Sequence, residues 1–183
     1  MRLLITRRDF VHGVVWSSLG GYLVLAGGAC RRARAPSAAP ASRFFSDADQ
    51  RTLTAACERI LPRDQDPGAI DLGVSEFIDR ALAGDRFYAS TRAPLREALR
   101  ALDREAAAAH GRAFAALDAI DQDAALARWE ERDAATFHTL LTLTLEGAFS
   151  DPIHGGNRGQ AGWRLIGFAP DPLRPGLPGL ARR

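Results

Sequence analysis

The sequence predicts an all-α fold: a small helical bundle with a glycine-rich C-terminal loop, preceded by an export leader. Apolar residues recur at helical spacing in several stretches, proline and glycine separate those stretches, and we find no convincing β-strand and no internal repeat. The 183 residues suffice for one domain with appendages, and a composition of 46% hydrophobic and 25% charged residues is typical of a globular protein. We therefore expect one packed helical core.

The first two helices are expected on either side of a loop. Ser46 is a residue type that caps helix N-termini, and the apolar spacing after it predicts a helix over 47–61, which Pro62 ends. Residues 62–73 are rich in Asp, Pro and Gly and predict a loop, and residues 74–82 predict a short helix. The residues expected on the inner faces are Leu53, Ala56, Cys57, Ile60 and Leu61, and then Val74, Phe77, Ile78 and Leu82.

Three further helices are expected, over 94–110, 121–130 and 133–148. Pro94 is acceptable in a first turn, where no amide donor is needed. The inner residues are expected to be Leu95, Leu99, Leu102 and Ala106 in the first, Leu126 and Trp129 in the second, and Phe137, Leu140, Leu141, Leu145 and Ala148 in the third. Arg96, Arg100, Asp103 and Arg104 lie on the other face of the helix over 94–110, which we interpret as a solvated face.

Residues 1–29 are predicted to be a twin-arginine signal peptide. The run Thr6-Arg7-Arg8-Asp9-Phe10-Val11 places paired arginines and an aromatic residue as in that export signal, and a modestly apolar stretch follows it. The critical residues are Arg7, Arg8 and Phe10; the alternative is that adjacent arginines occur by chance in an arginine-rich chain. Because the twin-arginine pathway carries folded cargo, the chain is expected to bind a cofactor or to travel with a partner that does.

The leader is followed by a candidate lipidation site. Cys30 comes after small residues, as in a lipoprotein box, and ordinary cleavage nearby is the alternative. Residues 30–45 are predicted to be a flexible tether, residues 46–170 the helical domain, and residues 171–183 a Pro/Gly-rich tail of a kind that lies extended on another protein.

Charge and motif content exclude several classes of function. All 24 basic residues are Arg, and residues 42–183 hold 18 Arg against 21 acidic residues, so the basic pI comes from the leader and a nucleic-acid partner is not expected. The sequence has no haem-attachment motif, no dinucleotide-binding glycine motif and no paired histidines at metal-ligand spacing. Cys57 is expected to be a buried, inert thiol. Redox chemistry, if present, would take place on another chain.

The most specific segment of the domain is Glu146 to Phe168. It contains Glu-Gly-Ala-Phe-Ser-Asp-Pro-Ile-His-Gly-Gly-Asn followed by Gly-Trp and an aliphatic-Gly-Phe end. In this run the chain resembles the gluconate 2-dehydrogenase subunit 3 family, and looser similarities upstream extend the resemblance over residues 46–170. His154 stands where family members often have tyrosine. The motif residues, expected to be structural or partner-binding, are Glu146, Gly147, Phe149, Asp151, Pro152, Gly155, Gly156, Asn157, Gly162, Trp163 and Gly167.

The resemblance implies a small, non-catalytic subunit of a periplasmic sugar or sugar-acid dehydrogenase. In such complexes the large subunit resembles the glucose-methanol-choline oxidoreductases and binds FAD, and a multi-haem cytochrome c subunit accepts the electrons. The small subunit holds no cofactor, catalytic residue or metal; it supplies the signal for the twin-arginine translocase and helps the large subunit to mature. The chain is then expected at the inner membrane, held by the complex or by a lipid anchor.

Two alternatives remain open at this stage. One is a stand-alone periplasmic binding module or lipoprotein. The other is a hydrolase using Ser150, Asp151, His154 and Glu146, although Asp151 before a proline predicts turn capping, with Ser150 capping beside it. We expect Glu146 to Phe168 to form an ordered loop with a short closing turn. Trp163 and Phe168 would pack on the bundle, and Asp151 and Asn157 would bond backbone amides.

Overall fold

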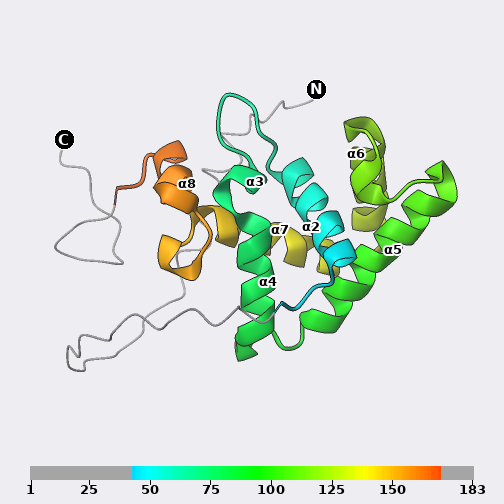
Figure 1. The fold of residues 1–183 in the computed structure, drawn as a ribbon, viewed down its shortest axis with the longest axis horizontal. Helices are drawn as coiled ribbons and strands as arrows, with labels where there is room; N and C mark the ends of the chain where they lie inside the picture. The colour runs from blue at the N-terminus through cyan, green and yellow to red at the C-terminus, as the bar shows by residue number, and fades with distance from the viewer. Residues whose placement is uncertain (1–42, 170–183) are drawn as a thin grey trace. The chain divides into compact units, whose positions relative to one another are not determined.

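The structure, a computed structural model, describes residues 43–169 (Figure 1). The predicted signal peptide, Cys30 and the predicted tail lie outside the described residues. Within them the chain is all-α and contains no strand, which confirms the predicted class. The α-helices are α2 (Asp47–Ile60), α3 (Ala69–Leu72), α4 (Val74–Gly84), α5 (Arg92–His110), α6 (Ala119–Arg132), α7 (Ala134–Phe149) and α8 (Ala161–Leu165). Four 3-10 turns join them: η1 (Arg86–Tyr88), η2 (Phe114–Ala116), η3 (Pro152–His154) and η4 (Arg158–Gln160).

Helices α2 and α7 are the centre of the bundle. Each contacts α3, α4, α5 and α6 as well as the other, and α7 also contacts α8. Figure 1 shows α6 and α8 at opposite ends of the described bundle. None of the described helices is both long and apolar enough to span a membrane.

The first helix begins as the sequence predicts. The Ser46 hydroxyl accepts a hydrogen bond from the Asp49 amide at 3.2 Å, and the Asp49 carboxylate accepts one from the Ser46 amide at 3.4 Å. This reciprocal capping box satisfies two amides that would otherwise lack partners at the helix start. The local sequence therefore fixes this boundary.

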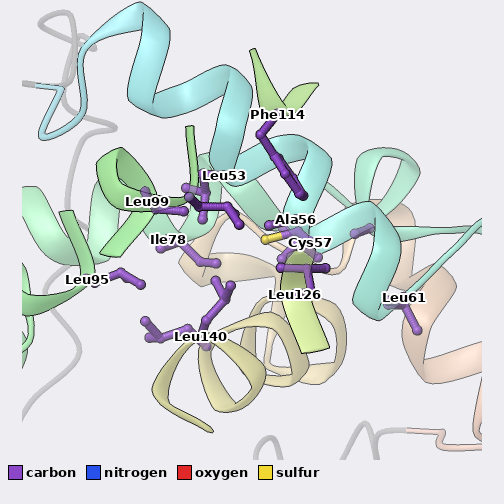
Figure 2. Packing of buried hydrophobic residues seen from close by; sticks show 14 of the residues in the cluster. Leu53, Ala56, Cys57, Leu61, Ile78, Leu95, Leu99, Phe114, Leu126 and Leu140 are labelled. Atoms are coloured by element: carbon purple, nitrogen blue, oxygen red, sulfur yellow. The ribbon is translucent and has the colours of Figure 1, made fainter. Parts of the chain in front are cut away.

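The hydrophobic core gathers between α2, α4, α5 and α7 and takes in Phe114 from η2 and Leu126 and Trp129 from α6 (Figure 2). Cys57 lies within it, 1% exposed, and accepts a weak hydrogen bond from the Thr144 hydroxyl at 3.5 Å. Burial raises the pKa of the Cys57 thiol to about 12. The prediction that this thiol is buried is confirmed, and the raised pKa favours its unreactive protonated form.

Helix α7 turns a different face inward from the one expected. Leu140 and Ala148 are buried as predicted, but Leu143 and Thr144 are buried where Leu141 and Leu145 were expected, and those two leucines are only partly covered. The helix is apolar on most sides, so periodicity alone does not select one face. The loop expected over 62–73 also contains a helical turn, α3, which closes at Gly73 with φ of 71°.

The charged face of α5 is only partly solvated: Arg100 and Arg104 are exposed, as the interpretation predicts, whereas Arg96 and Asp103 are partly buried. The Arg100 guanidinium makes two bonds, of 3.0 and 3.1 Å, to the buried Asp49 carboxylate. Burial alone would raise the pKa of Asp49, but the bonds from Arg100 and Ser46 lower it overall. The Asp103 carboxylate accepts the Phe114 amide at 2.8 Å. These residues join α5 to α2 and η2.

Two residues that the sequence places in the tether pack on the bundle. Phe44 and Phe45 donate their backbone amides to one carboxylate oxygen of Asp79, at 2.9 and 2.8 Å. The Phe45 ring is 4% exposed, and the Arg96 guanidinium lies 3.9 Å from the centre of the Phe44 ring. The ordered domain thus includes both phenylalanines.

Candidate functional site

The chain after α7 folds back on the bundle as a compact unit, residues 150–169, which we call the C-terminal cap. It contains η3, η4 and α8. The expected ordered loop was only partly right, because α7 continues through Phe149 and residues 161–165 are helical. The glycines at 147, 155, 156, 159 and 162 made this stretch look less helical than it is, since glycine disfavours helix interiors.

Asn157 is the centre of the cap. Its side chain is fully buried, and its amide nitrogen donates to the Ser150 carbonyl at 2.9 Å while its amide oxygen accepts the Gly162 amide at 2.8 Å. Its backbone amide donates to the Gly147 carbonyl at 2.7 Å. One residue thereby binds groups at the end of α7 and at the start of α8, which confirms the expectation that Asn157 bonds backbone groups.

Asn157 also adopts a left-handed backbone, with φ of 45°. Asparagine tolerates this conformation better than most residues with a side chain. Gln160 is the other described residue with a side chain and a positive φ, at 61°. Two such residues three positions apart make the cap a locally strained segment that its surroundings hold in shape.

Two motif glycines allow backbones to touch. A Cβ on Gly156 would overlap the Gly147 carbonyl, and a Cβ on Gly162 would overlap the Ala148 carbonyl. Both carbonyls belong to the last turns of α7. The cap therefore reaches α7 only because these positions have no side chain.

Gly147 serves the same purpose on the other side of α7. A Cβ there would lie 2.9 Å from the Phe77 ring and 3.2 Å from a Val74 methyl, so the glycine lets α4 and α7 cross closely. Gly167, with φ of 71°, follows α8 and donates its amide to the Arg164 carbonyl at 3.2 Å. The left-handed glycine ends α8 as such glycines commonly end helices.

Trp163 fixes the cap to the end of α7. Its indole nitrogen donates to the Phe149 carbonyl at 2.7 Å, and its ring meets Phe168 edge to face at 4.9 Å between centroids. Both rings are half-buried, and Phe149 packs against the core. Trp163 thus packs at the joint between cap and bundle.

The polar residues of the motif cap a turn. The Asp151 carboxylate accepts the Ile153 amide at 3.0 Å, and Pro152 occupies the first turn of η3, so the predicted capping by Asp151 is confirmed. Capping by Ser150 was wrong, because its hydroxyl is buried without a hydrogen-bond partner among residues 43–169. His154 is exposed, and no described hydrogen bond joins its ring to Asp151 or Ser150. This arrangement gives the hydrolase alternative no support.

Sequence reasoning missed the α4 residues that hold the cap from outside. Arg80 donates to the Gly155 carbonyl at 2.8 Å, and its guanidinium fills the space that a Cβ on Gly155 would need. Arg158 pairs with Glu76 at 3.2 Å. The contact between Arg80 and Gly155 spans 75 residues, so no local pattern announces it. The paired glycines Gly155-Gly156 were the one sequence feature that hinted at a close contact here.

Glu146 is the motif's ionisable group with an altered acidity. It is half-buried on α7, and the Tyr88 hydroxyl from η1 donates to its carboxylate at 2.9 Å. Burial raises the pKa of Glu146, and the Tyr88 hydrogen bond only partly offsets that effect. The carboxylate joins η1 to α7.

Glu146→Gln tests this assignment through pH. Because the folded state raises the pKa of Glu146, wild-type protein should lose stability as pH rises from the ordinary pKa of a glutamate through the raised one. Glutamine keeps the shape and can still accept the Tyr88 hydroxyl. We expect the variant to melt above wild type at pH 8 and close to it at pH 4.5, in thermal unfolding followed by circular dichroism. A constant difference between the two proteins at every pH would show that Glu146 titrates normally.

The motif residues thus serve mainly to shape the backbone. Within the described residues, no three His, Cys, Asp or Glu side chains gather where they could hold a metal ion. The arrangement joins α7, α4 and α8 into one rigid end of the bundle. This end of the bundle presents a preformed surface.

Comparison with known proteins places this architecture in a family. The family model described as "Gluconate 2-dehydrogenase subunit 3" matches residues 47–170, which include all the α-helices described above. No curated protein and no solved structure matches the chain. Since the family model covers well over half of the 183 residues, the chain belongs to the gluconate 2-dehydrogenase subunit 3 family, a family of accessory subunits of dehydrogenase complexes.

Proposed function

We propose that the chain is a non-catalytic subunit that escorts, matures and stabilises the FAD-containing large subunit of a periplasmic, membrane-associated gluconate or related sugar dehydrogenase. The observation that carries the proposal is how the family motif is used. Asn157, Gly156, Gly162 and Trp163 are engaged in backbone contacts that shape the cap. A motif used in this way suits a subunit that acts by binding another protein.

The proposal also covers the other subunits, the export route and the location of the complex. The large subunit is a flavoprotein of the glucose-methanol-choline type, and a multi-haem cytochrome c is a possible third subunit. The twin-arginine translocase carries the assembled, folded pair, directed by Arg7, Arg8 and Phe10. The complex resides on the periplasmic side of the inner membrane, held by its other subunits or by a lipid on Cys30.

Replacing Arg7 and Arg8 together with lysine tests the escort role. Lysine keeps the charge but not the planar, multi-donor guanidinium, so recognition of the signal should fail. We expect both this chain and the flavoprotein to remain in the cytoplasm, and periplasmic dehydrogenase activity to fall to background. The measurement is activity and immunoblotting of both chains in the two cell fractions.

Arg31→Lys with Arg32→Lys is the matched control, because it makes the same chemical change outside the signal motif. Both proteins should then be exported normally. If the Arg7/Arg8 variant stays inside while the flavoprotein still reaches the periplasm, the flavoprotein travels independently and the escort role must be abandoned.

A further inference from the structure

The cap differs in charge from the rest of the domain. Residues 43–149 carry 13 arginines against 19 acidic residues, a net charge of −6. The cap, residues 150–169, carries two exposed arginines, Arg158 and Arg164, against one acidic residue, Asp151, a net charge of +1. Arg80, also exposed, adds a third guanidinium where it binds Gly155. The cap together with Arg80 therefore forms a cationic end on an otherwise anionic domain, where Glu76 pairs with one of the three arginines.

An exposed apolar side chain lies within this cationic end. Ile153 is 82% exposed on η3, two residues from the carbonyl that Arg80 binds. A single exposed isoleucine is ordinary on a protein surface. The backbone that carries it is held by the Asp151 cap and Pro152 on one side and by the amide of Gly155 on the other.

The cap needs no ordering before it binds. Asn157, the close glycine contacts and the indole of Trp163 join it to α7, while Arg80 and the Arg158–Glu76 pair join it to α4. Preformed surfaces avoid the loss of conformational entropy that weakens association. Arginine is among the residues enriched in protein-binding hot spots.

We infer that the C-terminal cap is the surface that binds the flavoprotein subunit, with Ile153 entering an apolar depression and Arg80 and Arg164 facing carboxylates around it. The inference rests on the proposed function and adds the contact surface to it. The positive charge of the cap requires an acidic surface on the flavoprotein at the point of contact. Arg158 already pairs with the Glu76 carboxylate and contributes less, whereas Arg80 and Arg164 bond, among residues 43–169, only backbone carbonyls, of Gly155 and Gly159, and keep their full charge.

The test compares variants at the two ends of the bundle. Ile153→Asp is matched by Ile120→Asp, because Ile120 is 80% exposed and belongs to α6, the helix that Figure 1 shows at the opposite end of the bundle from α8. Arg164→Glu is matched by Arg128→Glu, an exposed arginine of α6. The probe is the flavoprotein that co-purifies with the full-length wild-type chain from membranes, and its affinity for each purified variant is measured by biolayer interferometry.

We expect Ile153→Asp and Arg164→Glu each to weaken binding at least about 10-fold, and both α6 variants to remain within about twofold of wild type. Thermal melting of each variant checks that it is folded. Wild-type affinity should also fall as salt is raised, and Arg164→Glu should reduce that dependence.

Failure of the proposed function and failure of the assigned interface give different results. If no flavoprotein co-purifies with wild type, the proposed function fails and the inference with it. If the flavoprotein binds all four variants equally, the cap is not the interface, although the proposed function stands. If Ile153→Asp instead abolishes self-association in light scattering, or binding to phosphatidylglycerol vesicles, while flavoprotein binding is unchanged, the assigned occupant is wrong.

Discussion

Replacing Asn157 with alanine is expected to destabilise the domain by about 4 kcal/mol. The substitution leaves the buried Gly162 amide and the Ser150 carbonyl without their side-chain partner. Each such loss costs about 1–3 kcal/mol. Alanine also disfavours the left-handed backbone at φ of 45°, by about 1 kcal/mol. The measurement is urea denaturation followed by far-UV circular dichroism.

Asn157→Gly separates the loss of the side-chain hydrogen bonds from the strain of the left-handed backbone. Glycine adopts the same backbone without strain but makes no side-chain bonds, so its loss should be about 1 kcal/mol smaller than that of alanine. Equal losses would show that strain contributes nothing. A loss below about 1 kcal/mol for alanine would mean that Asn157 does not hold the cap to α7.

Gly162→Ala is expected to have the second-largest effect, a loss of about 3 kcal/mol. The new Cβ would overlap the Ala148 carbonyl, and neither backbone can move without breaking the contact between α8 and α7. The displaced indole should also lose its bond to the Phe149 carbonyl, which would appear as a change in tryptophan fluorescence. Chemical denaturation gives the magnitude.

Gly84→Ala is the control for this glycine. Gly84 is the last residue of α4, and a Cβ there would meet no other atom within 4 Å. Alanine is the better helix former, so the variant should match wild type or exceed its stability by about 0.5 kcal/mol. If Gly162→Ala behaved like Gly84→Ala, the close approach of α8 to α7 would be contradicted.

The sequence predicted the helices because their signals are local. Ser46 and Asp49 lie within one turn of each other, and the Leu95, Leu99, Leu102 and Ala106 stripe repeats at helical spacing; the structure buries all four. Such features depend on neighbours a few residues apart. Periodicity failed for α7, which is apolar on most sides.

The sequence indicated which residues form the motif of the cap, but not how these residues pack. The resemblance indicated Asn157, Gly156 and Gly162, but not that the two glycines admit carbonyls of α7. The partners in these contacts lie far apart in sequence: Tyr88 and Glu146 are separated by 58 residues. Side-chain pairing at that separation leaves no periodic trace. Only the folded arrangement of α4, η1 and α7 reveals it.

The central claim is that this chain works by assisting a flavoprotein, and flavin loading of that flavoprotein tests it most directly. The flavoprotein is produced with and without this chain in the same host, and bound FAD and dehydrogenase activity are measured per mole of each purified protein. We predict full FAD content and activity only when both chains are present, and neither in this chain alone. A flavoprotein that is fully loaded and active without its companion would contradict the account.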